Sequence, residues 1–507
     1  MQLIIKTTLY LFLLTLPVFS HASTDEGGLR WHDGEFRLGF ETLELPGQER
    51  MGLLGGSYLV DMGRYSYVGL GVYGALTGER GGFFTGGVDG GLRFPLNETF
   101  STELGVFVGG GGGGAAPQGG GLMLRPYLGL SWHLPTSIIG VQLSEVRFPN
   151  GDISSRQLGL NLSWPMQELV VPGWLEDSPS IAGTGIGAKN GRYSVVSQRY
   201  IPDTGTCNTA GAVAEEGVTL LGFEAETSLE RGGFATLATA GAGSGQSDGY
   251  AEVLAGVGWR YPLSSQLAGK LQLRAGLGGG GAVDTGGGLI TKLEGGLEWT
   301  PSQYSAIGLG IGRFEAPDGG FAANMASVSF GYRFAGSDRS SSQLATFSPR
   351  HWQISISSDS YLLDGSEGRK VGSSARGNVG LITAQIDSML NRHLLLSGAA
   401  GAAYDGGAGG YAVGLVGVGW HTPLPSMESV WLRADAQLGV AGGGGLDVGG
   451  GFLWQSKLGL GWQLNKAVSL QLAWGRVNAP AGTLDSELVS VGISVRTTTL
   501  HGVPNGR

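Results

Sequence analysis

A glycine run followed by strict two-residue alternation is the feature that most constrains this chain. Residues 108–132 read VGGGGGGAAPQGGGLMLRPYLGLSW, and nine of the first fourteen are glycine. From residue 122 onward apolar side chains occupy every second position, which is the period of a β-strand with two different faces. Because tight turns need positive φ, which glycine adopts without strain, the stretch is predicted to be a β-hairpin with a glycine tip.

The same pattern occurs three times. Glycine triplets begin at residues 119, 286 and 449, and in each copy a tryptophan lies eleven residues after the last glycine of the triplet. The spacings, 286 − 119 = 167 and 449 − 286 = 163, are far longer than those of solenoid repeats. Two segments without alternation, rich in Pro, Ser or Gly, are predicted linkers. The chain is therefore expected to contain β-barrel repeats at 23–165, 191–334 and 351–497, linkers at 166–190 and 335–350, and a tail at 498–507.

Each predicted unit contains eight alternating segments of about 9–14 residues, long enough for tilted strands to cross a bilayer. Tryptophan and tyrosine gather at the predicted strand ends, as they do at membrane interfaces. Only 14% of the residues are charged. A secreted array of β-sandwiches would show the same alternation, so it is the alternative. These features favour an all-β fold, a transmembrane antiparallel β-barrel of about 24 strands.

The N-terminus predicts export. Residues 1–22 contain Lys6, an apolar core at 9–19 and the sequence SHA, the pattern of a cleaved signal peptide. The net charge of −9 disfavours a nucleic-acid partner. With the strand pattern, these features predict a protein of the bacterial outer membrane.

The segments ASVSFGYRF (326–334) and LGLNLSW (158–164) resemble strands of Gram-negative outer-membrane β-barrel proteins, and each unit is similar in size to the eight-stranded small barrels. The resemblance implies outer-membrane lipid and the barrel-insertion machinery as partners. Members of such families end in a strand with a terminal aromatic residue. Phe334 and Trp164 fit that pattern inside the chain, whereas the C-terminal segment LVSVGISVRTTTLHGVPNGR does not.

Twenty-four strands can close in two ways. Each unit can form its own eight-stranded barrel, or all strands can form one wide ring, and both arrangements pair every edge. Glycines on the polar face (Gly129, Gly296, Gly459) fit the crowded interior of a narrow barrel. Single-chain outer-membrane barrels usually close once. We therefore expect one wide ring, with three narrow barrels as the alternative.

A wide ring predicts an outer-membrane channel or export conduit for solutes or a polymer. Its polar, glycine-lined lumen would carry Arg125, Tyr127, Lys292, Glu294, Arg433, Asp435 and Lys457. Three plugged barrels would instead make a non-conducting structural or surface-interaction protein. A lipid-active barrel enzyme is a third alternative.

The sequence offers no pattern for catalysis, cofactors or metals. The glycine runs are not followed by G-K-[ST] and do not open a βαβ unit, so nucleotide binding is not predicted. GGGGLDVGG (442–450) matches part of a calcium nonapeptide, but no tandem array follows. None of the seven histidines has metal-ligand spacing, and His133 and His421 lie near predicted strand ends. Cys207 has no second cysteine to pair with. The chain is therefore expected not to be an enzyme.

Overall fold

The structure is a computed structural model that describes residues 30–174, 186–211, 213, 217–245, 247–339, 341, 347–364, 367–373, 375–425 and 427–504. These residues form 24 antiparallel strands and one short 3-10 turn, η2 (Glu230–Gly232). The predicted all-β class is confirmed. The predicted signal peptide, 1–22, lies outside the described residues. Among the described residues no helix has both the length and the apolar character needed to cross a membrane.

The first eight strands form a closed ring, barrel 1. Its last strand pairs with its first, from Arg30 opposite Val170 to Glu41 opposite Gly159. The strands are β1 (Arg30–Glu44), β2 (Arg50–Asp61), β3 (Ser66–Thr77), β4 (Phe84–Pro95), β5 (Phe100–Gly112), β6 (Met123–His133), β7 (Ile138–Arg147) and β8 (Ser154–Pro172).

Barrel 2 closes in the same way, with Ala323 opposite Pro202 at one end of the seam and Ser337 opposite Ala188 at the other. Its strands are β9 (Ala188–Pro202), β10 (Val218–Ser228), β11 (Gly233–Ser244), β12 (Ala251–Pro262), β13 (Leu267–Gly279), β14 (Leu289–Trp299), β15 (Ser305–Glu315) and β16 (Ala322–Ser337).

Barrel 3 has its seam between Phe347 opposite Gly502 and Leu362 opposite Glu487. Its strands are β17 (Phe347–Leu362), β18 (Val379–Met389), β19 (Leu394–Ala403), β20 (Ala412–Leu424), β21 (Met427–Gly442), β22 (Phe452–Gln463), β23 (Val468–Asn478) and β24 (Asp485–Gly502).

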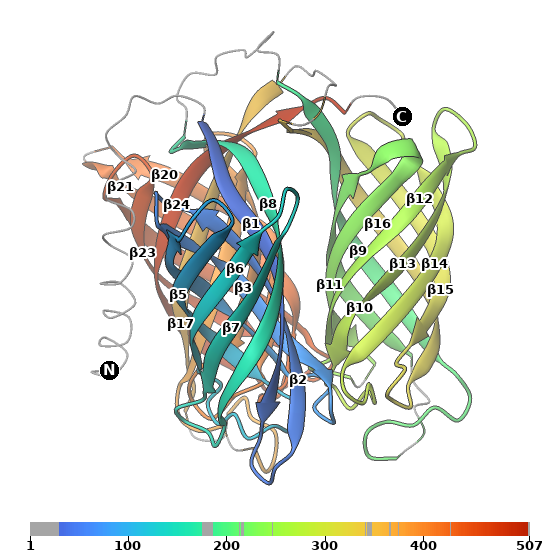
Figure 1. The fold of residues 1–507 in the computed structure, drawn as a ribbon. Helices are drawn as coiled ribbons and strands as arrows, with labels where there is room; N and C mark the ends of the chain where they lie inside the picture. Colours follow the sequence, from blue (N-terminus) through green and yellow to red (C-terminus); the bar gives the residue numbers. More distant parts are fainter. Residues whose placement is uncertain are drawn as a thin grey trace.

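The expectation of one wide ring is therefore wrong. A wide ring needs β8 beside β9 and β16 beside β17, and the registers of the described strands place β8 on β1, β16 on β9 and β24 on β17 instead. Figure 1 shows the green and yellow strands of barrel 2 closing on themselves beside the other two barrels. The physical reason is visible inside each ring, where the polar side chains of one unit bond to one another across a narrow interior.

The two ends of each barrel differ. The terminal end is where the chain enters and leaves the barrel, and the tip end carries the glycine hairpins. In barrel 1 the terminal-end turns at 62–65, 96–99 and 134–137 are four residues long, whereas the tip-end hairpin at 113–122 has ten. In barrels 2 and 3 the first tip-end loop, at 203–217 and 363–378, is longer still.

Strands continue into both segments predicted as linkers and into the predicted tail. β8 extends to Pro172 and β24 to Gly502, because these extensions pair with one another at the terminal end: Thr497–Thr499 pair with residues 170–172. Ala335 and Gly336 of β16 pair with Gly502 and His501 in turn. These pairs join the three barrels at their terminal ends, above the alternating parts of the strands (Figure 1).

Candidate functional site

Polarity in the barrels is the inverse of that in a soluble β-sandwich. Lys292 is 0% exposed and lies inside barrel 2, whereas Ile311 is 74% exposed on its outer face. Leu158 and Leu160 on the outside of barrel 1 are likewise 70% and 64% exposed. In water this arrangement would hide charge and display apolar surface, both unfavourable. In lipid the same arrangement is favourable, so the barrels are built for an apolar solvent.

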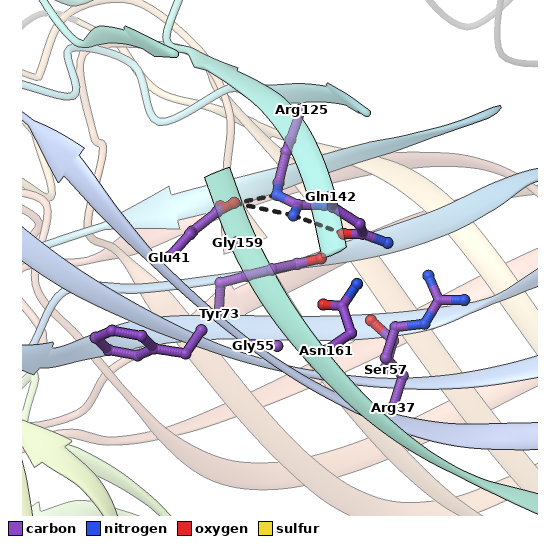
Figure 2. Close-up of a pocket in the computed structure, with 11 residues that line it drawn as sticks. Arg37, Glu41, Gly55, Ser57, Tyr73, Arg125, Gln142, Gly159 and Asn161 are labelled. Atoms are coloured by element: carbon purple, nitrogen blue, oxygen red, sulfur yellow. Dashed lines mark hydrogen bonds and ion pairs between the residues drawn. The ribbon is translucent and has the colours of Figure 1, made fainter. Parts of the chain in front are cut away.

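Charged and hydroxyl groups fill the interior of barrel 1. The Arg125 guanidinium donates to both carboxylate oxygens of Glu41, at 2.8 and 3.0 Å, and to Gln142 Oε1 at 3.0 Å. Figure 2 shows these side chains pointing toward one another between the strands. The hydroxyl of Tyr127 donates to Asp89 at 2.7 Å. Further polar contacts in this interior come from Arg37, Glu35, Glu103, Arg93 and Tyr67.

The interior of barrel 2 is centred on a buried lysine. Lys292 Nζ donates to Glu252 and, at 2.7 Å, to Gln198 Oε1. The other oxygen of Glu252 accepts from the hydroxyls of Tyr200 and Tyr250, at 2.8 and 3.0 Å. Further interior ion pairs join Arg274 to Glu224 and Glu294, Lys270 to Glu224 and Glu226, and both Arg192 and Arg260 to Glu226 and Glu298.

Barrel 3 is crossed by one strong pairing. Arg433 on β21 donates to both oxygens of Asp387 on β18, at 2.7 and 2.9 Å, and to Asp435 at 2.7 Å. Lys457 Nζ donates to Gln385 Oε1 at 3.2 Å. The Arg433–Asp387 and Lys457–Gln385 bonds join strands that are not neighbours in the ring. The Arg125–Glu41 pair in barrel 1 and the Lys292–Glu252 pair in barrel 2 do the same.

The residues expected to line a common channel lie in three separate interiors. Six of them are at most 7% exposed and the side chain of Glu294 is 12% exposed. In barrel 1 a cavity beside the Arg125–Glu41 pair measures about 10 Å³ of space open to the centre of a water molecule, which is room for about one water. The seven residues are Arg125 and Tyr127 in barrel 1, Lys292 and Glu294 in barrel 2, and Arg433, Asp435 and Lys457 in barrel 3.

Glycines on the inner face make room for these side chains. A Cβ on Gly129 would lie 2.8 Å from the side chain of Glu103, and one on Gly105 would overlap the ring of Tyr127. The large polar residues of one strand therefore occupy the space above the glycines of the next strand.

The glycine hairpins form contacts between barrels, which sequence reasoning missed. The hairpin of each barrel packs on the third strand of a neighbour: β13 on β3, β21 on β11 and β5 on β19. The hairpin of barrel 2 therefore packs on barrel 1, that of barrel 3 on barrel 2, and that of barrel 1 on barrel 3. This is a head-to-tail arrangement that closes into a ring of three barrels. We call these three contacts the glycine interface.

The three contacts use equivalent residues. The last glycine of each triplet has positive φ, +97°, +104° and +101° at Gly121, Gly288 and Gly451. A Cβ there would overlap the carbonyl oxygen of an alanine in the neighbouring barrel, at Ala403, Ala75 and Ala242 respectively.

In two of the contacts a backbone hydrogen bond crosses the interface, from Gly81 N to Gly286 O at 2.9 Å and from Gly409 N to Gly119 O at 3.2 Å. The glycine runs therefore permit direct backbone contact as well as tight turns.

An arginine fixes the glycine hairpin of barrel 1. Arg80, in the loop between β3 and β4, donates to Ala115 O at 2.7 Å and to Glu49 Oε1 at 2.8 Å. The hydrogen bond from Arg80 lowers the pKa of Glu49, which lies in a loop outside the strands. Three tip-end loops are thus held together beside the glycine interface.

Asp447 of the partial calcium motif and Asp284, at the equivalent place in the hairpin of barrel 2, both accept hydrogen bonds from loop residues. Asp447 accepts from Gly449 N at 3.3 Å, and from Thr483 N and Oγ1 at 3.1 and 2.8 Å. Asp284 accepts from Gly286 N and Gly320 N, at 3.2 and 2.9 Å. Both carboxylates therefore anchor glycine hairpins to the adjacent loop. Within the described part of the chain, no group of three or more His, Cys, Asp or Glu side chains could hold a metal.

No protein-family model and no curated protein matches the chain. Similar solved structures include the ferric enterobactin receptor (PfeA) of Pseudomonas aeruginosa, with 10% identity, a TM-score of 0.28, and coverage of 93% of this chain and 82% of that one. The siderophore receptor PirA from Acinetobacter baumannii has 7% identity, a TM-score of 0.28, and coverage of 93% and 81%. OpdQ of Pseudomonas aeruginosa has 12% identity, a TM-score of 0.18, and coverage of 93% and 98%. Similarity at this level indicates neither function nor location.

Proposed function

We propose that this chain is a non-conducting protein of the bacterial outer membrane, in which three plugged barrels form one rigid unit that presents its tip-end loops at the cell surface. The observation that carries the proposal is the bonding across each interior: Arg125 to Glu41, Lys292 to Glu252 and Arg433 to Asp387. Opening a path would separate buried charges, which costs several kcal/mol for each pair.

The outer faces and the loops support the proposed location and orientation. Apolar side chains on the outside would contact outer-membrane lipid, and insertion would use the barrel-insertion machinery after cleavage of the signal peptide. Exposed tryptophans near the terminal end, Trp132, Trp299 and Trp462 among them, suit a membrane interface. Outer-membrane barrels have short periplasmic turns and longer extracellular loops. The terminal ends would therefore face the periplasm and the glycine interface the exterior.

The three barrels are also proposed to be copies of one eight-stranded unit. The support is the equivalence of the glycine interface, in which Gly82, Gly249 and Gly410 have φ of +86°, +89° and +92° and each would strike backbone of the neighbouring hairpin if it carried a Cβ. A head-to-tail contact of this kind in a single chain has the form of a fused three-fold assembly.

Conductance measurements test the proposal. Purified protein reconstituted into planar bilayers should give no current steps above the lipid baseline, because the interiors are filled. Bilayers that receive detergent alone provide the baseline. Stable, reproducible steps would overturn the proposal and favour the channel hypothesis.

Membrane embedding has its own test. Ile311→Arg, on the outer face of β15, should destabilise the folded protein in lipid by about 2–4 kcal/mol because the charge enters the apolar layer. Val371→Arg is the matched control, since Val371 is fully exposed in the loop at 363–378 and should change stability by less than about 0.5 kcal/mol. Urea unfolding in lipid vesicles measures both. Equal effects would argue against a lipid-facing β15.

A further inference from the structure

Four side chains form a closed quartet at the terminal end of barrel 3. The Arg496 guanidinium carbon lies 4.3 Å from the ring centroid of Trp174 and 5.3 Å from that of Trp431. The ring of His421 lies 5.3 Å from Trp174 and 6.1 Å from Trp431. A guanidinium between two indole faces keeps its in-plane N–H groups free for an acceptor.

Several nitrogens in this quartet are buried without a hydrogen-bond partner: Arg496 Nε, Trp431 Nε1 and His421 Nε2. The three residues are 7%, 4% and 6% exposed. Arg496 also donates from Nη1 to Gln463 Oε1 at 3.0 Å. The amide nitrogen of Gln353, opposite Arg496 on β17, is unpartnered as well. Buried polar groups without partners are costly, so their grouping around Arg496 indicates a missing hydrogen-bonding partner.

Arg496 differs from the other interior arginines. Arg125, Arg274 and Arg433 each bind a carboxylate. In the described part of the chain no Asp or Glu forms an ion pair with Arg496. A buried cation with no counter-charge is unfavourable, and an anion would remove both this penalty and the unpaired donors.

The quartet is assembled from distant parts of the chain. Trp174 follows barrel 1 and is held over barrel 3 because Gly173 N donates to Arg496 O at 2.9 Å and Thr498 Oγ1 donates to Gly173 O at 2.9 Å. Trp174 Nε1 donates to Trp352 O at 2.9 Å. The residue that covers barrel 3 therefore comes from the segment joining barrels 1 and 2, and it breaks the three-fold equivalence seen at the tips.

We propose that this quartet binds one small oxyanion of the phosphate class. Arg496 and Trp431 supply N–H donors to its oxygens. His421 Nε2 is a donor or an acceptor according to tautomer, and a protonated phosphate, which has both acceptor oxygens and a hydroxyl, satisfies it in either form. A free phosphate and the phosphomonoester headgroup of a lipid share this chemistry.

Thermal unfolding of the full chain in phosphate-free maltoside micelles tests the site. One arm titrates inorganic phosphate and the other adds phosphatidic acid. The Tm should rise with ligand concentration in at least one arm, since a ligand that binds the folded state alone stabilises it, and the responding arm identifies the source. Trp431→Phe keeps the ring and removes one donor, and should weaken binding about tenfold.

Arg496→Gln should abolish the response, whereas Arg476→Gln, at an exposed arginine on β23, should leave it unchanged. If Arg496→Gln does not fold, Trp431→Phe still decides, because it retains the charge and the packing. No Tm response in either arm would overturn the proposal. A response of equal size in wild type and Trp431→Phe would also overturn it, since binding would then lie elsewhere.

Discussion

Alanine at Gly82 should destabilise the three-barrel unit by at least about 3 kcal/mol, far more than alanine at Gly47. Both glycines belong to tip-end loops of barrel 1 and have nearly the same backbone conformation, with φ of +86° and +82°. A Cβ at Gly47 has no atom within 4 Å, whereas one at Gly82 would lie 2.6 Å from Gly279 C and 2.8 Å from Gly280 Cα of barrel 2.

Gly82→Ala and Gly47→Ala share the backbone strain of a non-glycine residue at positive φ, and only Gly82→Ala also disrupts the glycine interface. A non-glycine residue in the left-handed region costs about 1–2 kcal/mol, and this cost is common to both variants. The remaining cost at Gly82 arises because the atoms it strikes are backbone and cannot rotate away. Barrels 1 and 2 must then move apart at their tips.

Two measurements check this expectation. Urea unfolding in lipid vesicles gives the stability difference between Gly82→Ala and Gly47→Ala. Spin labels at Ala115 and Ala282, both exposed in the glycine hairpins, report the distance between barrels 1 and 2 in a Cys207→Ser background. The distance distribution should broaden in Gly82→Ala and stay narrow in Gly47→Ala. Identical stability and distances in the two variants would show that the glycine interface is not maintained.

The two faces of each strand were predictable because alternation is a local property. Leu128, Leu130 and Trp132 lie on the outside of β6 and are 46–54% exposed, while Arg125 and Tyr127 lie inside, as the period of two indicates. The number of strands followed from the same pattern. Neither result needed knowledge of which strand lies beside which.

Ring closure was not predictable in this way, since the first strand of a unit offers the same backbone edge to either partner. The expectation of a wide ring relied on the general observation that a single-chain outer-membrane barrel usually forms one closed ring. The inward glycines were the better indicator: Gly129 lies over Glu103, a contact that belongs to a crowded narrow interior.

The glycine interface and the quartet were missed for different reasons. The conformational needs of a tight turn are enough to explain glycine at a hairpin tip, so the local sequence did not indicate contact with a neighbouring barrel. The feature that could have indicated it is the run of six glycines from Gly109 to Gly114, which is longer than a turn needs. Arg496 looks like any inward residue of an alternating strand. Its significance arises from Trp174, which is more than 300 positions away in the chain.

Removal of the buried ammonium group by Lys292→Met should destabilise barrel 2 by about 3–5 kcal/mol. Lys292 is 0% exposed, and Glu252, which it binds, is 1% exposed. The substitution preserves most of the side-chain volume but leaves a carboxylate in the interior whose remaining donors are Tyr200 and Tyr250. The cost therefore comes from an uncompensated charge and not from a cavity.

The double variant Lys292→Met/Glu252→Gln should recover most of this loss. A neutral amide oxygen still accepts from the two tyrosine hydroxyls, and no charge is left without a partner, so the stability should return to within about 1–2 kcal/mol of wild type.

Arg476→Met is the exposed control. Arg476 and Asp485 form an ion pair whose side chains are 59% and 41% exposed, and the loss of this pair should cost at most about 1 kcal/mol. Urea unfolding in vesicles ranks the three variants. If Lys292→Met behaves like Arg476→Met, the interior of barrel 2 is hydrated enough to solvate a carboxylate, and the plugged interior on which the proposed function depends would have to be abandoned.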